Sequence, residues 1–457
     1  MFDKNEQGPP SLLKGAGGIS YLTESSAKQI INKVLNISTA DETEIFVGSE
    51  SSALTRFAEN HIHQNVAENS FGIRVRAIID KQMGEAHISK CDDDSLKKVV
   101  TDAIEIARVT PPDPELLPLP GSQIYQPVEA YHEESISPMQ RAKYIAKAIT
   151  LCKNAGLTAA GIFSNGSSSS AMGNSNGLFA YHRSSVVNFS ITVMGDDSSG
   201  WAQKHSRKSA DIETEKLTGI AIQKAELNNN PKTMEPGKYT VILEPDAVAG
   251  LIGYLAFGFN ALAVDEGRSY LVGKVGKKIA GESISLRSDV YHPLHQGRPY
   301  DGEGIPTQCV ELIKNGIAAG LVYDRLTALK HNVEPTGHGE GGHNSYGAFP
   351  DCPVMDGGGA TLEEMIALTE RGVLVTHFHY QNLVDPMQVI VTGMTRDGTF
   401  WIENGKIQYG LKNLRFNQKI LEMLNNVEMM SEPVLASGMV VPAMKVNQFN
   451  FSSGTEF

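Results

Sequence analysis

The chain has 457 residues, enough for two or three domains that each bury a core of their own. Hydrophobic residues make up 41% and charged residues 20%, the composition of an ordinary globular protein rather than of a disordered chain. The formal net charge is -12, and no local cluster of Lys and Arg is visible. Because affinity for phosphate backbones rests on clustered cations, this balance argues against a nucleic-acid partner.

The beginning of the chain, MFDKNEQGPPSLLKGAGG, has acidic residues and prolines where a secretory signal needs a cationic start and an apolar run. No segment reaches about eighteen uninterrupted apolar residues, so we expect no helix across a bilayer and no membrane partner. The cysteines are scattered without a CxxC pair, a pattern typical of free thiols in a reducing compartment. We therefore predict a cytoplasmic protein.

The first half of the chain carries short strand patterns followed by a helical pattern. Alternating and β-branched residues predict strands at 44–47, 54–61, 71–80 and 83–90. DDDSLKKVVTDAIEIARV then begins with Asp caps and has apolar residues at helical spacing. The same order returns roughly 120 residues later, with strands predicted at 168–172, 177–183, 186–194 and 200–206 and a helix over IETEKLTGIAIQKAEL.

These two runs suggest an internal duplication, since GEAHIS resembles GWAQKHS and the two helical patterns also match. A chance echo between strand-rich segments is the alternative interpretation. Each copy would place helices on one face of a sheet, an α+β arrangement. We predict an N-terminal α+β domain over 1–235, with the copies separated by an extended Pro-rich linker at about 109–123.

The turn-rich sequence NNNPKTMEPG marks the start of a second domain at 236–457. It begins with a strand pattern, KYTVILEP, and a helical pattern from Asp246 to Leu262. Short strands and turns follow, with single helical patterns at 306–315 and 361–370. We predict a mostly β, barrel-like C-terminal domain.

Five phrases stand out along the chain: GIRVRAIIDKQMGEAHISK, FNALAVDEGRSYLVGKVGKKIA, PYDGEGIPTQCVELIKNGIAAGLVYDRLTA, TGHG and FWIENGKI. In their order and spacing these phrases resemble the TldD/PmbA family. In that family the TldD type is a zinc peptidase with an HExxxH helix and a distal cysteine ligand, whereas the PmbA (TldE) type lacks the metal site. The family is also named for modulation of DNA gyrase, and the acidic charge of this chain favours an indirect effect over DNA contact.

The resemblance implies that the zinc ligands are missing here. The helix EPDAVAGLIGYLAFGFNAL occupies the place of the HExxxH helix. In that register Gly253 and Gly258 stand where the histidines would be, and Tyr254 stands where the glutamate would be. Catalytic zinc needs about three protein ligands and a base for its water. The tail ASGMVVP lacks the expected cysteine, so the chain is similar to the PmbA (TldE) type and we expect no cofactor in it, with zinc only in a TldD-like partner.

The stretch PTGHGEGGHNSYG concentrates glycines and histidines, and we predict that it lines a groove for an extended peptide. Its glycines permit positive φ and close approach of another backbone. A GxGxxG-like spacing is present, but no cation lies beside it as a phosphate site would require. The predicted substrate-binding residues are Gly337, His338, Gly339, Gly341, Gly342 and His343.

Two further sites remain possible from the sequence, a histidine metal site and a carboxylate pair. Four histidines could form a relocated metal site, since His377 and His379 lie two apart on a predicted strand and would join His338 and His343. Asp301 and Glu303 could form a carboxylate pair, although a turn capped by Asp is the more common use of such a sequence.

Three functions follow for the chain. The first is a non-catalytic, peptide-binding subunit that pairs with a TldD-like HExxxH subunit in a heterodimer. The second is a stand-alone metallopeptidase with a relocated metal. The third is a homodimeric peptide-binding module without chemistry.

Overall fold

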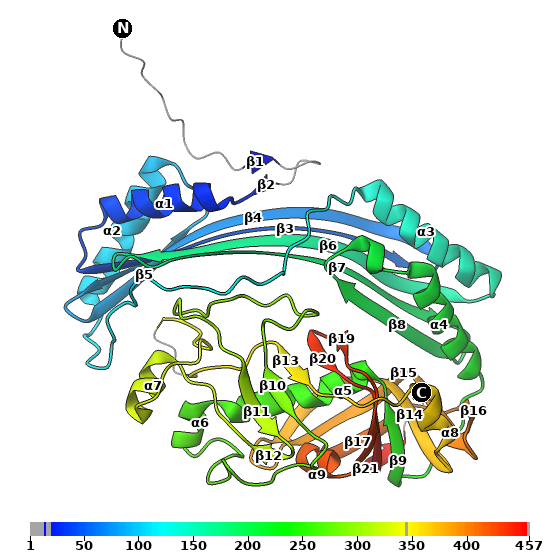
Figure 1. The fold of residues 1–457 in the computed structure, drawn as a ribbon. Coiled ribbons are helices and arrows are strands. Elements are labelled where there is room, and N and C mark those ends of the chain that lie inside the picture. The colour runs from blue at the N-terminus through cyan, green and yellow to red at the C-terminus, as the bar shows by residue number, and fades with distance from the viewer. Residues whose placement is uncertain (1–12, 15–19, 343–345, 455–457) are drawn as a thin grey trace.

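A computed structural model describes residues 13–14, 20–342 and 346–454. Its N-terminal half is built on one long antiparallel sheet with the strand order β5-β4-β3-β6-β7-β8. Figure 1 shows this sheet as a curved layer with the C-terminal half of the chain against its lower side. The strands are β3 (Glu42–Ala58), β4 (His61–Ile79), β5 (Gln82–Ile88), β6 (Thr158–Asn174), β7 (Phe179–Met194) and β8 (Ser199–Ser206).

The order helix, three strands, helix occurs twice in this half. We call residues 24–109 the first unit and residues 138–227 the second unit. β3 begins at Glu42 and β6 at Thr158, 116 residues later, and these two strands pair with each other at the centre of the sheet. The helices are α1 (Glu24–Ile37) and α2 (Asp93–Val109) in the first unit, and α3 (Pro138–Asn154) and α4 (Thr214–Leu227) in the second.

The same glycine contact packs helix on sheet in both units. A Cβ on Gly84 would lie 2.1 Å from the carbonyl oxygen of Ala103 in α2, and a Cβ on Gly200 would lie 2.1 Å from that of Ala221 in α4. Only glycine allows the strand backbone to approach the helix backbone this closely. The repeated contact supports the predicted duplication.

Several strands are longer than the sequence predicts. The patterns at 44–47 and 54–61 belong to one strand that ends at Ala58, and those at 177–183 and 186–194 are one strand. The polar run GSESS between the first two patterns hides the alternation on which the prediction rests, yet its backbone stays in the β3–β6 ladder, where it pairs with GSSSS of β6. Helices α1 and α3, which frame the units, were not predicted.

The C-terminal half closes one of its sheets into a ring, which confirms the barrel-like prediction. The strands pair in the order β14-β9-β21-β17-β15, and β15 returns to β14. These strands are β9 (Gly237–Leu243), β14 (Arg371–Asp385), β15 (Ile390–Glu403), β17 (Leu414–Lys419) and β21 (Met444–Gly454), extended by β16 (Lys406–Gly410) and β18 (Val427–Met430).

A second sheet packs beside the ring, with short helices around it. Its strands are β10 (Leu286–Ser288), β11 (Val310–Lys314), β12 (Ile317–Ala318), β13 (Pro353–Met355), β19 (Val434–Ala436) and β20 (Met439–Val441). The short helices of this half are α7 (Arg325–His331), α8 (Leu362–Ala367) and α9 (Ile420–Asn425). In the N-terminal half, η1 (Ser209–Asp211) lies between β8 and α4, and β1 (Leu13–Lys14) pairs with β2 (Ser20–Tyr21). Among the described residues, no helix is both long and apolar enough to cross a membrane.

Two helix predictions in this half are wrong. The pattern from Asp246 to Leu262 divides into α5 (Pro245–Ile252), a 3-10 helix η2 (Gly253–Phe259) and α6 (Ala261–Asp265). Asn260 has an extended backbone and caps α6, since its side chain accepts a hydrogen bond from Leu262 N at 2.9 Å. The pattern at 306–315 contains strand β11, which turns at Asn315 and Gly316, both at positive φ, into β12.

Candidate functional site

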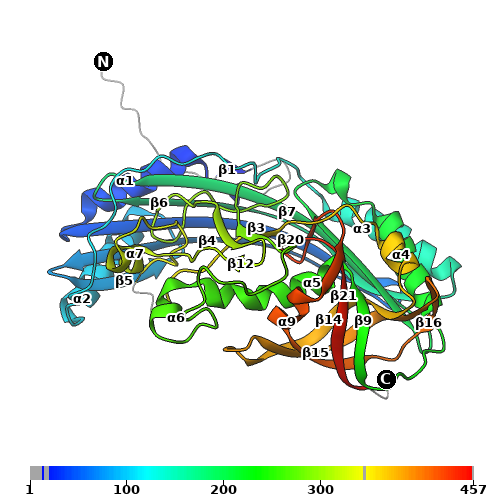
Figure 2. The same ribbon diagram turned by 60° about the horizontal axis from the view of Figure 1, so that its bottom comes forward.

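The glycine-rich loop lies where the first unit meets the C-terminal half. Figure 1 shows α7 and α6 below β5, and in Figure 2, where the bottom of the molecule comes forward, α7 lies at the level of β5. Gly337, Gly341 and Gly342 have φ values of 69°, 79° and 73°. These are left-handed conformations that glycine adopts without strain. The backbone conformation of the loop therefore requires glycine at these three positions.

Two of these glycines, and Gly339 between them, face the chain's own turn at residues 301–306. A Cβ on Gly337 would lie 2.2 Å from the carbonyl oxygen of Pro306, and one on Gly341 would lie 2.1 Å from that of Gly302. A Cβ on Gly339 would lie 2.4 Å from Oε2 of Glu303. The close approach that the sequence assigned to a bound peptide is thus made by this turn. Only Gly342 looks toward the first unit, with Nη2 of Arg76 2.9 Å from its Cβ position.

Asp301 ties the turn to the loop. Its Oδ1 accepts bonds from the backbone nitrogens of Glu303 and Ile305, both at 2.9 Å, and its Oδ2 accepts one from Gly339 N at 2.7 Å. Burial raises the pKa of Asp301 to about 6, against the lowering effect of these bonds. Asp301 thus acts as the cap of a turn, the more common of the two uses considered from the sequence.

Glu303 is the more perturbed carboxyl of the pair. Burial, with the nearby charge of Asp301, raises its pKa to about 7. Its Oε2 accepts a bond from Arg325 N at 2.9 Å, at the start of α7. A carboxyl with this pKa changes charge near neutrality. The contacts of Glu303 with Gly339 and with the start of α7 therefore depend on pH.

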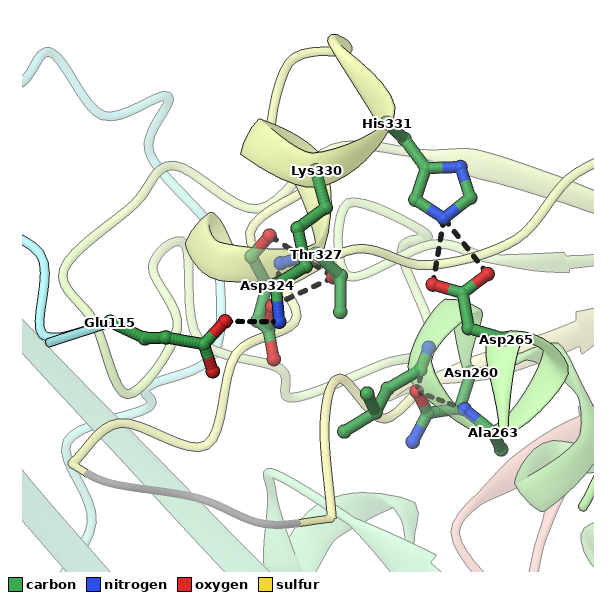
Figure 3. Close-up of polar contacts among 9 residues, drawn as sticks. Glu115, Asn260, Ala263, Asp265, Asp324, Thr327, Lys330 and His331 are labelled. Atoms are coloured by element: carbon green, nitrogen blue, oxygen red, sulfur yellow. Dashed lines mark hydrogen bonds and ion pairs between the residues drawn. The ribbon is translucent and has the colours of Figure 1, made fainter. Parts of the chain in front are cut away.

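Helix α7 joins this loop region to both halves of the chain (Figure 3). Lys330 Nζ lies 2.8 Å from Glu115 of the linker between the units, and His331 Nε2 lies 2.8 Å from Asp265 of α6. Asp324 caps the helix by accepting from Thr327 N at 2.7 Å. The guanidinium of Arg325 donates to the carbonyl of Pro118, also in the linker, at 2.5 Å.

A buried ion pair of the first unit lies next to the loop, across the cleft described below. Arg76 Nη1 lies 2.6 Å from Glu44 Oε1, and these residues are 6% and 3% exposed. The pKa of Glu44 is raised, because burial outweighs the attraction of Arg76. Nε of Arg76 is buried and has no hydrogen-bond partner among the residues that the structure describes. The sequence signal for this pair is a charged residue within the alternating strand FGIRVRAIID.

Two cavities border the loop. A cleft of about 290 Å³ separates the loop from the first unit and is lined by Glu44, Arg76, Glu303, Arg325, Gly341 and Gly342 among others. A wider groove of about 1020 Å³ lies on the other side, where Phe257, Tyr346 and Met387 contribute apolar surface and are 62%, 78% and 44% exposed. Gly341 borders both cavities. The predicted groove residues Gly341 and Gly342 therefore do line open space.

The predicted histidines do not assemble into a metal site within the described part of the chain. His338 is 3% exposed, and its ring bonds the carbonyl of Thr336 at 2.9 Å and Oγ of Ser288 at 2.8 Å. Burial lowers its pKa to about 4, so the ring is neutral and fixed in the interior. His343 lies outside the described residues.

The strand histidines occupy a different junction. His377 Nε2 lies 3.3 Å from Asp397 Oδ2, and its ring centroid lies 4.3 Å from that of Trp201 in β8. His379 is exposed on the same strand. Over the ranges 13–14, 20–342 and 346–454, no group of three or more His, Cys, Asp or Glu side chains could hold a metal ion.

The positions that match an HExxxH helix are filled by apolar neighbours. A Cβ on Gly253 would lie 2.9 Å from Cε of Met439, which comes from the tail at 436–442. A Cβ on Gly258 would lie 2.0 Å from the ring of Tyr270, itself 3% exposed. Burial raises the pKa of the Tyr254 hydroxyl, which disfavours its deprotonation. These residues do not fit a zinc ion, because they offer neither imidazole nor carboxylate, and the neighbours of Gly253 and Gly258 leave no room for side chains that would hold one.

Comparisons with known proteins give a consistent result over nearly the whole chain. Family models described as PmbA/TldA metallopeptidase domain 1, central domain and C-terminal domain match residues 43–107, 126–228 and 236–453. A metalloprotease PmbA of Escherichia coli O157:H7 is 26% identical over 85% of this chain and 87% of its own length. A metalloprotease TldD homologue of Buchnera aphidicola is 25% identical over 88% of this chain and 91% of its own length.

Solved structures agree on the fold. A crystal structure of TldE from Thermococcus kodakarensis covers 93% of this chain and 99% of its own, with a TM-score of 0.84 and 24% identity. A Thermotoga maritima protein named for modulation of a DNA gyrase has the same TM-score, 0.84, at 19% identity, and covers 93% of this chain and 100% of its own. At these identities the likeness extends to the fold alone.

Proposed function

Since the chain belongs to the PmbA/TldD metallopeptidase family, we propose that it is a non-catalytic subunit of a cytoplasmic peptidase complex. In this proposal it pairs with a zinc-bearing HExxxH relative, in a heterodimer, and holds extended or unfolded peptides for cleavage by that partner. The observation that carries the proposal is the filling of the HExxxH positions by Met439 and Tyr270 in a chain that otherwise keeps the whole family fold.

Restoring a zinc site would require more than three substitutions. A histidine at Gly258 would displace the ring of Tyr270, whose hydroxyl donates to the carbonyl of Leu255 at 3.0 Å in a buried setting. Overpacking of this kind costs about 1–3 kcal/mol, and the displaced hydroxyl would lose its partner. The apolar packing supports a role in which this helix is structural.

Peptide binding is supported by the groove beside the loop. The exposed ring of Phe257 stacks edge-to-face on Phe349 at 5.3 Å and offers apolar surface to a side chain. Such pockets lined by aromatic and methionine side chains suit unfolded peptides, whose apolar residues are accessible. The nearby cleft adds the charged side chains of Arg76, Arg325 and Glu340, which suit the polar groups of a peptide main chain.

The test mixes the purified chain with an HExxxH relative and measures cleavage of a fluorogenic unfolded-casein peptide. We expect no cleavage and no stoichiometric zinc in the chain alone, and cleavage by the mixture that exceeds the relative's own rate. Phe257→Ser is expected to raise the KM of the mixture about tenfold, whereas Leu368→Ser, a control at a similarly exposed leucine outside the groove, leaves it unchanged. Cleavage by the chain alone, with about one zinc per chain, would overturn the proposal.

A further inference from the structure

The first unit leaves a long strand edge without a partner. β4 pairs with β3 from His61 to Ile78, but its other edge pairs with β5 only from Ile73 to Ile79. From Ile62 to Phe71 no backbone bond to another described segment is formed on that outer edge. Most side chains of this stretch are exposed, including Ile62 at 41%. An unpaired edge of this kind presents a row of main-chain donors and acceptors.

The stretch has few of the features that usually protect an edge. Its sequence, from His61 to Gly72, is HIHQNVAENSFG, without a lysine or a proline. The ladder with β3 is regular from Gln64 to Phe71, opposite Arg56 to Ser49, and its register shift, between Arg56 and Phe57, lies at the Ile62 end of the stretch. Natural proteins protect long edges by these means or cover them with another segment. The outer edge of β4 is therefore a surface that is built for pairing.

The second unit shows what kind of segment covers such an edge. β7 pairs with β8 only from Val187 onward, so its stretch before Val187 corresponds to the open stretch of β4. There Ser185 N donates to the carbonyl of Ala130 at 3.0 Å, and the guanidinium of Arg183 lies 3.7 Å over the ring of Tyr131. Ala130 is completely buried. The segment at Ala130 and Tyr131, between the two units, thus contacts in the second unit an edge whose counterpart is left open in the first.

We propose that the outer edge of β4, from Ile62 to Phe71, binds an extended segment of a substrate polypeptide as an added strand. The main-chain groups supply affinity that does not depend on the sequence of the bound segment. This inference rests on the proposed function, in which the chain handles unfolded peptides. It adds a second contact, on the sheet of the first unit, to the groove beside the glycine-rich loop.

The first experiment compares the two units by photo-crosslinking in the full chain. A p-benzoylphenylalanine replaces Glu68 in β4 or, as the matched control, Ser184, which lies 116 residues later in β7. The probe is a fluorescein-labelled decapeptide of alternating threonine and valine. We expect the peptide to crosslink at position 68 at least tenfold more than at 184. Equal labelling at both, or a crosslinked dimer of the chain in place of a peptide adduct, would overturn the proposal.

The second experiment tests main-chain pairing by anisotropy with the same decapeptide. Of two neighbouring residues in a strand, one N–H points to β3 and the other points to the outer edge. Of Ala67→Pro and Glu68→Pro, the variant that removes the outward N–H is expected to keep the wild-type melting temperature and to weaken binding at least tenfold. The other variant lowers the melting temperature. A decapeptide with N-methylated valines should bind at least tenfold more weakly to the wild-type chain.

Binding that is unchanged in the well-folded proline variant and insensitive to N-methylation would also overturn the inference. Cleavage by the mixture with an HExxxH relative is measured in parallel. Partner-dependent cleavage without crosslinking at 68 removes the edge contact and leaves the proposed function intact. Crosslinking at position 68 without partner-dependent cleavage supports the edge contact and contradicts the proposed function. A chain that begins at Ser20 separates a segment bound in trans from competition by the chain's own first residues.

Discussion

The two units of the N-terminal sheet have the same order of elements but meet the C-terminal half differently. The second unit meets it through direct side-chain pairs: Lys224 Nζ lies 2.7 Å from Glu244, and Gln203 donates to Asp246 at 2.6 Å. The first unit meets it across a cleft of about 290 Å³ that is bordered by the glycine-rich loop. One end of the sheet is thus fixed to the ring while the other leaves space for a ligand, which places the candidate site at the first unit.

The largest effect is expected from Arg76→Met, which tests the buried pair behind the cleft. It leaves Glu44, 3% exposed, without its closest cation, and breaking a buried pair costs about 3–5 kcal/mol of unfolding free energy. The pKa of Glu44 is already raised above 4.5 in the folded protein, and the substitution raises it further. The folded state then binds the proton more tightly than the unfolded state, so stability falls as pH rises.

The loss in Arg76→Met is therefore expected to be greater at pH 8 than at pH 5, as measured by urea unfolding. The matched control is the double variant Arg76→Met with Glu44→Gln, which removes the buried charge and should regain more than half of the loss. A single variant within about 1 kcal/mol of the wild type at pH 8 would show that the pair does not support the first unit.

Lys224→Met is expected to have the next largest effect, because it breaks the fixed junction of the second unit. The two side chains of the Lys224–Glu244 pair are 13% and 16% exposed, so the pair is screened less than a surface pair. We expect a loss of about 2 kcal/mol in the free energy of unfolding. Glu244→Gln with Lys224→Met should recover part of it. If the loss is as small as for an exposed pair, the two junctions do not differ as described.

The sequence predicts the parts of this fold that depend on regular patterns. The amphipathic spacing of α2 and α4 and the alternation in FGIRVRAIID and VVNFSITVM are sufficient to place those elements. The ring-like C-terminal sheet is also predicted correctly from its many short strands and turns. Phrases shared with the family are enough to identify it, because they occur in order along most of the chain.

The errors arise where long-range contacts decide the local structure. Asn260 and the close contact of Gly258 with Tyr270 divide the predicted helix, and neither partner is adjacent in sequence. The polar middle of β3 gives no alternation, yet pairing on both sides keeps it extended. The positive φ values of the loop glycines agree with the sequence-based expectation. That they contact the chain's own turn at Gly302 depends on the fold and could not be read from spacing.

His338 offers a pH-dependent test of the loop at the open junction. Its pKa is lowered from 6.5 to about 4 by burial, so only the unfolded state takes up a proton as pH falls from 7 to 5. The stability that the neutral ring provides is complete above pH 6.5 and is lost as pH falls toward 4. Between pH 7 and pH 5 the wild type should lose about 2 kcal/mol that His338→Gln does not lose.

The comparison of His338→Gln with the wild type is made at each pH, since Asp301 and Glu303 have pKa values of about 6 and 7 and titrate in the same range in both proteins. Urea unfolding at several pH values gives the difference directly. A difference between wild type and variant that stays constant with pH would mean that His338 can be protonated in the folded protein and is not buried as described.

The smallest effect is expected from Lys330→Met at the open junction. The Lys330–Glu115 pair spans 2.8 Å, but its side chains are 45% and 57% exposed, so solvent and salt screen it. We expect a change below about 0.5 kcal/mol in the free energy of unfolding. Because α7 is also held by the bond from Arg325 to Pro118, its position should persist without the pair. A loss comparable to that of Lys224→Met would show that the first unit is fixed as firmly as the second, and the cleft would then be a rigid gap rather than a site with room to adjust to a ligand.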